Sequence, residues 1–340
     1  MNRTQTLPVF GVLIFGLLPA CGANEPTAQT PVAAASAPSA PPAPPPSEPS
    51  PPTATSSAVA TPAPAPAAKP EPVLSIKEAG FARPESVLYD AKNDVYLVTN
   101  INGSPGAADN NGFVSRVTPD GKVELKWIEA GKKGVKLDAP KGSAAVGDTL
   151  YVADITRVRM FDLTSGKPKG EVALPGATFA NDVAAGPDGK VYVSDSGIKL
   201  DDKGMTPTKS DAVYVIEKGK AKIFAKGEDL GQPNGVLVSG DKVWVVSVGS
   251  GELYALDKAG KKVDAQKLPK GQLDGLIGVG DDLVITSHEA HAIYRGKPGG
   301  TFEVVMGDFK APADIGYDTK RARVLVPDLQ DSTVEAYDLK

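Results

Sequence analysis

One stretch of this chain recurs 40 residues later, and that repeat limits the possible fold more than any other feature. The first copy covers residues 231–246 and the second covers 271–286, so Asn234 and Asp274 take equivalent places. A period near 40 residues that contains several short apolar segments is typical of a β-propeller blade, a sheet of four antiparallel strands. The repeat therefore predicts an all-β fold built from blades.

Residues 73–340 divide into six such units, each with an inner strand, a tight turn, a very apolar second strand and a third strand. Equivalent positions keep the 40-residue spacing, as between Gly142 and Asp182 or between Gly275 and Ile315. Two units are longer because insertions at 100–112 and 196–211 separate their second and third strands. Insertions in one slot of a repeat lie on one face of the assembly, so we expect both to overhang the same end of the central channel.

The sixth unit ends after its third strand, and one segment remains to complete it. Residues 73–77 alternate between apolar and polar side chains and have no other partner. Pairing this segment with the last unit would remove an exposed strand edge. We therefore predict a six-bladed β-propeller closed by an N-terminal strand in the last blade.

The first 20 residues have the pattern of a secretory signal peptide. Arg3 precedes an apolar run at 7–18, which is too short to span a membrane, and small residues follow it. Cys21 is the only cysteine and stands where cleavage would expose it, so the segment resembles a bacterial lipobox, in which this cysteine is lipidated. We expect a protein that is exported and lipid-anchored to a bacterial membrane, in the periplasm or at the cell surface. The alternative is plain secretion with an incidental cysteine.

Residues 21–72 consist mostly of Ala, Pro, Ser and Thr, and they cannot bury enough apolar surface to fold. We expect this segment to be an extended tether, with a proline-motif docking site as the alternative. The net charge is −4 and there is no basic run, so the composition argues against nucleic-acid binding. We expect a monomer that meets the membrane only through its lipid anchor.

The residues that begin the six inner strands should converge on one end of the channel. Each strand begins with a pair of polar or small residues, called the axial pairs below: Glu85-Ser86, Lys141-Gly142, Asn181-Asp182, Asn234-Gly235, Asp274-Gly275 and Ala313-Asp314. Asn-Gly and Asp-Gly also form turns, but Gly240-Asp241 and Gly280-Asp281 already supply the hairpin turns a few residues later. The axial pairs are therefore expected to line the mouth of the channel, as a metal site or as a solvated polar cap.

Four of the axial residues offer oxygen ligands. Glu85 and Asp274 supply carboxylates, and Asn181 and Asn234 supply amide oxygens. An all-oxygen set suits a hard divalent cation, Ca²⁺ above all, with Mg²⁺, Mn²⁺ or Zn²⁺ as alternatives. Two carboxylates against a divalent ion leave it able to polarise a carbonyl or activate water.

These positions resemble those of the senescence-marker/gluconolactonase (regucalcin-like) propellers, over nearly all of residues 73–340. The resemblance implies a metal held by Glu85, Asn181, Asn234 and Asp274, with Asp274 also serving as the catalytic general base and the metal holding a lactone ring oxygen. The chain departs from the family pattern after Glu85, where Ser86 replaces Gly-Pro. It also departs at Phe179, which replaces an arginine that grips sugar hydroxyls. Gluconolactone itself is therefore not the expected substrate.

Four more residues are candidates at the mouth: Lys141, Asp182, His288 and Asp314. His288 lies in a loop that faces the mouth, either as an acid, base or substrate donor or as a loop residue with no role. Lys141 could pair with Glu85 or Asp274, or it could attract an anion. A pair with Asp274 would weaken the metal interpretation.

Three aspartates end second strands on the same face, and we expect them to cap turns and tie blades together through backbone N–H groups: Asp154, Asp195 and Asp328.

Two functions of different class follow. The first is a metal-dependent lactonase-like or esterase-like hydrolase that acts on a small-molecule lactone or ester. The second is a non-catalytic binding or scaffold propeller of the NHL type, with a protein ligand. The fold cannot separate them, because propellers support both kinds of function.

Overall fold

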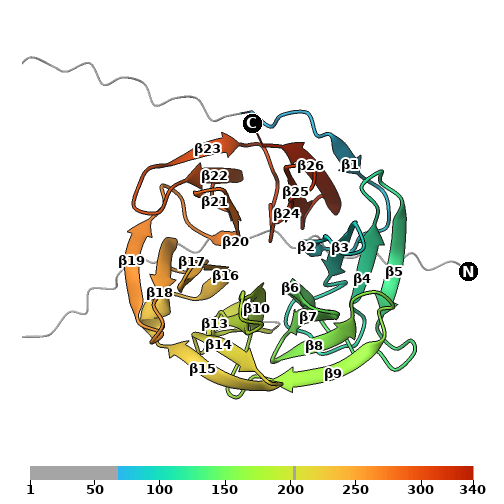
Figure 1. The fold of residues 1–340 in the computed structure, drawn as a ribbon, viewed down its shortest axis with the longest axis horizontal. Coiled ribbons are helices and arrows are strands. Elements are labelled where there is room, and N and C mark those ends of the chain that lie inside the picture. The colour runs from blue at the N-terminus through green and yellow to red at the C-terminus, as the bar shows by residue number, and fades with distance from the viewer. Residues whose placement is uncertain (1–67, 202–203, 340) are drawn as a thin grey trace, which may run out of the picture. The chain divides into compact units, whose positions relative to one another are not determined.

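A computed structural model of the protein describes residues 68–201 and 204–339. Six four-stranded antiparallel sheets surround a central axis, as Figure 1 shows, and the predicted six-bladed β-propeller is confirmed. The expected signal peptide, Cys21 and the tether as far as residue 67 lie outside the described residues. The part of the chain that the structure describes contains no helix with the length and apolar character needed to cross a bilayer.

The first three blades follow the chain in order. Blade one consists of β2 (Pro84–Asp90), β3 (Val95–Asn100), β4 (Phe113–Val117) and β5 (Val123–Glu129). Blade two consists of β6 (Pro140–Val146), β7 (Thr149–Asp154), β8 (Arg157–Asp162) and β9 (Pro168–Ala173). Blade three consists of β10 (Ala180–Ala185), β11 (Val191–Asp195), β14 (Ala212–Glu217) and β15 (Lys220–Lys226). The insertion in blade three forms a hairpin of its own, β12 (Ile198–Asp201) with β13 (Gly204–Pro207).

The last three blades are more regular. A 3₁₀ turn, η1 (Glu228–Leu230), leads into blade four, which consists of β16 (Pro233–Ser239), β17 (Lys242–Ser247), β18 (Glu252–Leu256) and β19 (Lys262–Lys267). Blade five consists of β20 (Leu273–Val279), β21 (Asp282–Ser287), β22 (Ala292–Gly296) and β23 (Phe302–Met306). Blade six consists of β24 (Gly316–Asp318), β25 (Arg323–Asp328), β26 (Thr333–Asp338) and β1 (Leu74–Ile76).

The hydrophobic core lies between blades. Each buried apolar cluster in the described residues combines side chains of two neighbouring blades, and the clusters together cover all six blade interfaces. Second strands such as β3 are buried along their whole length because they have a blade on each side, which explains their continuous apolar character. Stability is therefore spread around the ring.

The predicted closure by an N-terminal strand is confirmed. β1 pairs antiparallel with β26, with Leu74 opposite Ala336 and Ile76 opposite Val334. Buried Glu335 on β26 accepts hydrogen bonds from Ser75 Oγ at 3.0 Å and Tyr337 Oη at 2.6 Å, and its carboxylate lies 2.5 Å from Lys69 Nζ. Contacts with the last blade thus begin at Lys69.

The inner strand of blade six begins later than the sequence suggested. We expected it to start near Pro312, but β24 begins at Gly316. The reason is that Asp314 pairs with blade one instead: its N–H donates to Glu85 O at 2.9 Å, and its carbonyl accepts from Val87 N at 3.2 Å. This parallel bridge makes a second closure of the ring, close to the axis.

Candidate functional site

Each axial pair in blades one to five sits on a β-bulge. Pairing of the inner strand with the second strand shifts register at these residues, for example between Pro233 and Val236 in blade four. The same shift occurs in the other four blades at Pro84/Ser86, Pro140/Ser143, Ala180/Val183 and Leu273/Leu276. A bulge takes residues out of the ladder and re-aims their side chains. This is the local reason why the axial residues are free to serve a site.

Hydroxyl groups on the second strands hold the bulges in blades one, three and five. Thr99 Oγ1 accepts from Ser86 N at 3.0 Å, Ser194 Oγ from Asp182 N at 2.9 Å and Thr286 Oγ1 from Gly275 N at 2.7 Å. These bonds replace the ladder hydrogen bonds that the bulge removes. Sequence reasoning missed these three residues, although a hydroxyl at the next-to-last position of alternate second strands is visible in the sequence.

The glycines of the axial pairs are required by close packing rather than by turn geometry. A Cβ on Gly235 would lie 2.3 Å from the carbonyl oxygen of Asp274, and one on Gly142 would lie 2.6 Å from the Cα of Asp182. Inner strands of neighbouring blades therefore approach to a distance that only glycine allows. This observation decides against the interpretation of Asn234-Gly235 as a turn former.

The four residues predicted to hold a metal, called the metal cradle below, are all buried, with 4–6 % of their surface exposed: Glu85, Asn181, Asn234 and Asp274. Glu85 Oε2 and Asp274 Oδ1 are buried oxygens with no hydrogen-bond partner in the described residues. Burial, followed by the charges of Asp274 and Asp314, raises the pKa of Glu85 well above its usual value. Buried carboxylate oxygens are normally paired, so these two have the chemistry expected of oxygens that bind a cation.

Ser196 positions one amide of the cradle, that of Asn181. Asn181 Nδ2 donates to Ser196 Oγ at 3.0 Å, and Ser196 Oγ donates to the carbonyl of Pro233 at 2.8 Å. Because the amide nitrogen of Asn181 is used in this way, its oxygen is left for a ligand. The same bonds connect Asn181 to the residue that precedes Asn234.

A metal site at the cradle needs the amide ligands, because the carboxylates alone are too few to hold an ion. Across residues 68–201 and 204–339, no three His, Cys, Asp or Glu side chains are grouped so that they could hold a metal ion by themselves. A metal at the cradle would therefore depend on the amide oxygens of Asn181 and Asn234, as hard cations allow.

His288 contacts the cradle directly. Its Nε2 lies 2.6 Å from Asp274 Oδ2. Burial opposes protonation of this imidazole, but the hydrogen bond and the charge of Asp274 outweigh it and raise the pKa of His288. Asp274 thus has one oxygen bonded to a histidine and one oxygen without a partner.

Lys141 makes neither of the ion pairs considered from the sequence. Its side chain is fully buried, and Nζ donates to the carbonyl of Ala139 at 3.0 Å and lies 4.2 Å from the ring centre of Phe179. Within the described chain, no salt bridge joins it to Glu85 or Asp274. Burial lowers the pKa of Lys141 to about 8. Lys141 thus forms no ion pair with the cradle carboxylates, although its charge and that of Glu85 still interact.

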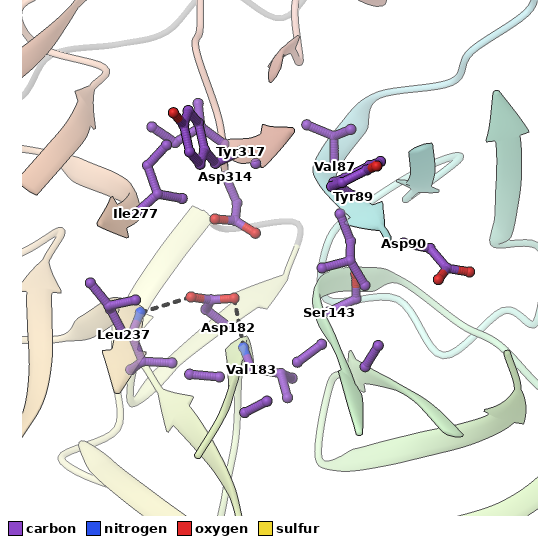
Figure 2. A pocket seen from close by; sticks show the side chains of 18 of the residues that line it. Val87, Tyr89, Asp90, Ser143, Asp182, Val183, Leu237, Ile277, Asp314 and Tyr317 are labelled. Carbon is purple, nitrogen blue, oxygen red and sulfur yellow. Dashed lines mark hydrogen bonds between the residues drawn. The ribbon is translucent and has the colours of Figure 1, made fainter. Parts of the chain in front are cut away.

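Asp182 and Asp314 are the second residues of their axial pairs, and both face the channel. Both line a cavity of about 440 Å³ to which all six inner strands contribute, called the channel cavity below. Figure 2 shows their carboxylates facing each other across it. The cavity reaches the turns between first and second strands, at Lys92 and Gly147, and not the insertions. These two residues thus line the channel cavity, while their charges still act on Glu85 of the cradle.

The insertions of blades one and three meet each other. A Cβ on Gly106 would lie 3.1 Å from Cβ of Leu200, so these two segments are in van der Waals contact. They therefore share one face, as the common slot in the repeat predicted.

The aspartates that end second strands accept backbone N–H groups, as expected, but the bonds lie within one blade and do not tie blades together. Backbone N–H groups donate to Asp154 from Ala139, to Asp195 from Phe179 and to Asp328 from Lys310. Each of these bonds secures the segment that leads into the inner strand of its blade.

No protein-family model matches the chain, and no curated protein sequence matches it either. Several solved structures align with it. A gluconolactonase from Xanthomonas campestris aligns at 16 % identity and a TM-score of 0.58, over 76 % of this chain and 87 % of that one. The calcium-binding protein regucalcin from Agrobacterium tumefaciens aligns at 15 % identity and a TM-score of 0.53, over 73 % of this chain and 82 % of that one. A catalytically inactive virginiamycin B lyase from Staphylococcus aureus, bound to quinupristin, aligns at 16 % identity and a TM-score of 0.56, over 78 % of this chain and 99 % of that one. At these identities the similarity shows a shared β-propeller fold.

Proposed function

We propose that this propeller binds one divalent cation, Ca²⁺ in the first instance, through Glu85, Asn181, Asn234 and Asp274, and hydrolyses a lactone or ester. The observation that carries the proposal is the pair of buried oxygens without partners, Glu85 Oε2 and Asp274 Oδ1. A buried carboxylate without a partner costs free energy, and a bound cation removes that cost. The proposed identity of the ion follows from an all-oxygen donor set.

The chemistry divides between the ion and the protein. A bound divalent cation would polarise the substrate carbonyl and lower the pKa of a nearby water. Asp274 accepts a proton from the attacking water, and His288, bonded to Asp274 Oδ2, holds that carboxylate in place and can pass the proton to the alkoxide oxygen that leaves as the acyl C–O bond breaks. Phe179 and Lys141 contact each other and are both buried, so an apolar group and an ammonium lie out of bulk water.

The substrate class follows from the neighbours of the cradle. Phe179 stands where the resembling family grips sugar hydroxyls with an arginine, so a polyhydroxylated lactone has no partner there. Lys141 is a buried ammonium that has one hydrogen bond and can donate two more. A lactone or ester with an apolar group beside Phe179 and an oxygen beside Lys141 fits best.

A binding propeller without catalysis is the second candidate. The specific observation in its favour is the low exposure of the cradle, which leaves little room for a substrate unless the insertions of blades one and three move. A propeller in a nidogen/laminin complex aligns with this chain at 15 % identity and a TM-score of 0.50, and there the partner is a protein.

Export and lipidation at Cys21 complete the proposal. The lipobox-like residues before Cys21 support them. Labelling of expressing cells with a palmitate analogue should mark the protein, and Cys21→Ser should abolish the mark. Unlabelled protein that is still exported would instead indicate plain secretion.

Metal binding is tested by melting the full chain with chelator and with added Ca²⁺, Mg²⁺, Mn²⁺ or Zn²⁺. At 100 times its Kd, a bound ion should add about 2.7 kcal/mol of stability. Asp274→Asn should abolish this gain, whereas Asp241→Asn, on an exposed turn, should not. A panel of lactones and aryl esters then separates the two functions: metal binding without turnover would favour the binding propeller, and no metal effect would reject the cradle.

A further inference from the structure

The channel cavity has the size and lining of a small-molecule site, and the proposed hydrolysis does not use it. At about 440 Å³ it falls within the roughly 300–1,000 Å³ of typical ligand pockets. Its walls are mainly apolar side chains of the inner strands, among them Val87, Val183, Val236 and Ile277. It opens at the face opposite the insertions, so a ligand can reach it without passing the cradle.

Two carboxylates from opposite sides of the ring form the floor of this cavity. Asp182 belongs to blade three and Asp314 to blade six, and Figure 2 shows them facing each other. Asp182 accepts backbone N–H groups at both oxygens, from Val236 at 2.7 Å and Val183 at 2.6 Å. Asp314 accepts from Ser86 Oγ at 2.6 Å through Oδ2, which leaves Oδ1 available to a ligand.

Ser143 gives an independent indication of a ligand. Only 8 % of this residue is exposed, it lines the same cavity, and its Oγ has no hydrogen-bond partner in the described residues. A buried hydroxyl without a partner costs free energy unless something polar binds it. A ligand head group that reached the floor could satisfy both Ser143 and Asp314.

The floor also lacks a counter-charge. Lys92 is the basic residue among those that line the cavity, and it lies at the open end, paired with Asp148. Lys141 lies by the cradle and bonds to Ala139. Among the described residues no cation pairs with these two acidic groups, and the charged form of a carboxyl group facing an apolar cavity requires a partner.

We propose that the channel cavity binds a small organic cation, an amine with an apolar body, whose ammonium group lies between Asp314 and Asp182. A metal ion fits less well, because Ca²⁺ requires six to eight oxygen ligands and the mainly apolar walls supply few. An ammonium group requires only about three acceptors, and the apolar walls would hold its hydrocarbon part. This inference does not depend on the proposed hydrolysis.

The test is calorimetric titration of the full chain with hexylamine and with 1-hexanol, which share an apolar body and differ in charge. Hexylamine should bind once per chain and roughly tenfold or more tightly than 1-hexanol, because a charged hydrogen bond is worth about 1.5–3 kcal/mol. Asp314→Asn should remove that preference. Asp188→Asn makes the same change in charge on an exposed turn outside the cavity, and it should leave binding unchanged.

Two further variants keep the test decisive. Ala185→Leu fills the cavity near its open end and should weaken hexylamine even if Asp314→Asn fails to fold. Asp274→Asn removes the cradle and should leave hexylamine binding intact, which separates this proposal from the metal site. Equal binding of hexylamine and 1-hexanol, or binding that survives Asp314→Asn and Ala185→Leu, would overturn the proposal, as would loss of binding in Asp274→Asn.

Discussion

His288 Nε2 lies 2.6 Å from one carboxylate oxygen of Asp274, while the other oxygen of the same carboxylate is buried without a partner. The two residues come from the inner strand of blade five and the loop that follows its second strand. One side chain thus combines a proton partner with a position open to a cation. Substitution of His288 should therefore affect proton transfer, whereas substitution of Asp274 should affect both proton transfer and cation binding.

Replacement of His288 by Asn should impair turnover more than metal binding. The imidazole contacts only the Asp274 oxygen that the ion does not need, so stabilisation by Ca²⁺ should persist. Loss of a group that moves protons typically costs about 10²–10⁴-fold in rate. Initial rates on the best ester or lactone of the panel measure this. His291→Asn changes the other, more exposed histidine and should be silent; equal losses in both variants would remove His288 from the mechanism.

Stability of the chelator-treated protein should fall as pH rises from 5 to 8. Burial raises the pKa of Glu85 and Asp314 well above the usual value and that of Asp182 to about 7. Each raised group binds its proton more tightly in the folded state, so its contribution is complete below the unfolded pKa of about 4 and is lost as pH rises through the folded pKa. Urea unfolding at several pH values measures the slope. Added Ca²⁺ should flatten it, and a rise in stability over this range would contradict the assignment.

Gly235→Ala should destabilise the ring, whereas Gly278→Ala should be nearly neutral. A Cβ at position 235 meets the Asp274 carbonyl at 2.3 Å, and overpacking of this kind costs about 1–3 kcal/mol. A Cβ at position 278 meets only Leu237 at 3.4 Å, an ordinary contact. Both glycines lie on inner strands, so strand propensity is matched. Denaturant midpoints compare the two, and equal midpoints would mean that the blades do not approach as closely as described.

Arg321→Ala should weaken the seam between blades six and one. Its guanidinium makes two bonds of 2.8 Å to Asp94 in blade one and one of 2.9 Å to Asp318. Because these groups are partly exposed, the loss should be about 1 kcal/mol. Arg116→Ala removes an ion pair with Glu124 inside blade one and should cost less. Thermal melting distinguishes the two variants. A larger loss of stability for Arg116→Ala would contradict the predicted contribution of Arg321 to the contact between blades six and one.

Much of the fold could be predicted because the period of 40 fixes which residues are equivalent, and equivalence fixes position around the axis. The cradle positions, the common face of the insertions and the pairing of β1 with β26 all follow from it. The repeat also explains why Asp154, Asp195 and Asp328 have the same role in different blades.

What could not be predicted depends on contacts between blades. The start of β24 shifted because Asp314 pairs with Glu85 and Val87 across the seam, which no local pattern reveals. Asp182 and Asp314 line the channel cavity, because a bulge re-aims Asp182 and pairing with blade one positions Asp314. The pairing of His288 with Asp274 depends on two loops brought together by the fold.

The hydrogen bond between Ser75 and Glu335 joins residues that are 260 positions apart. A ribosome must therefore finish nearly the whole domain before the first strand finds its partner. Until then β1 has no partner and its unpaired edge invites association with other chains, and contacts of such long range slow folding. A chain built in this way should depend on protection during synthesis far more than its compact final form would suggest.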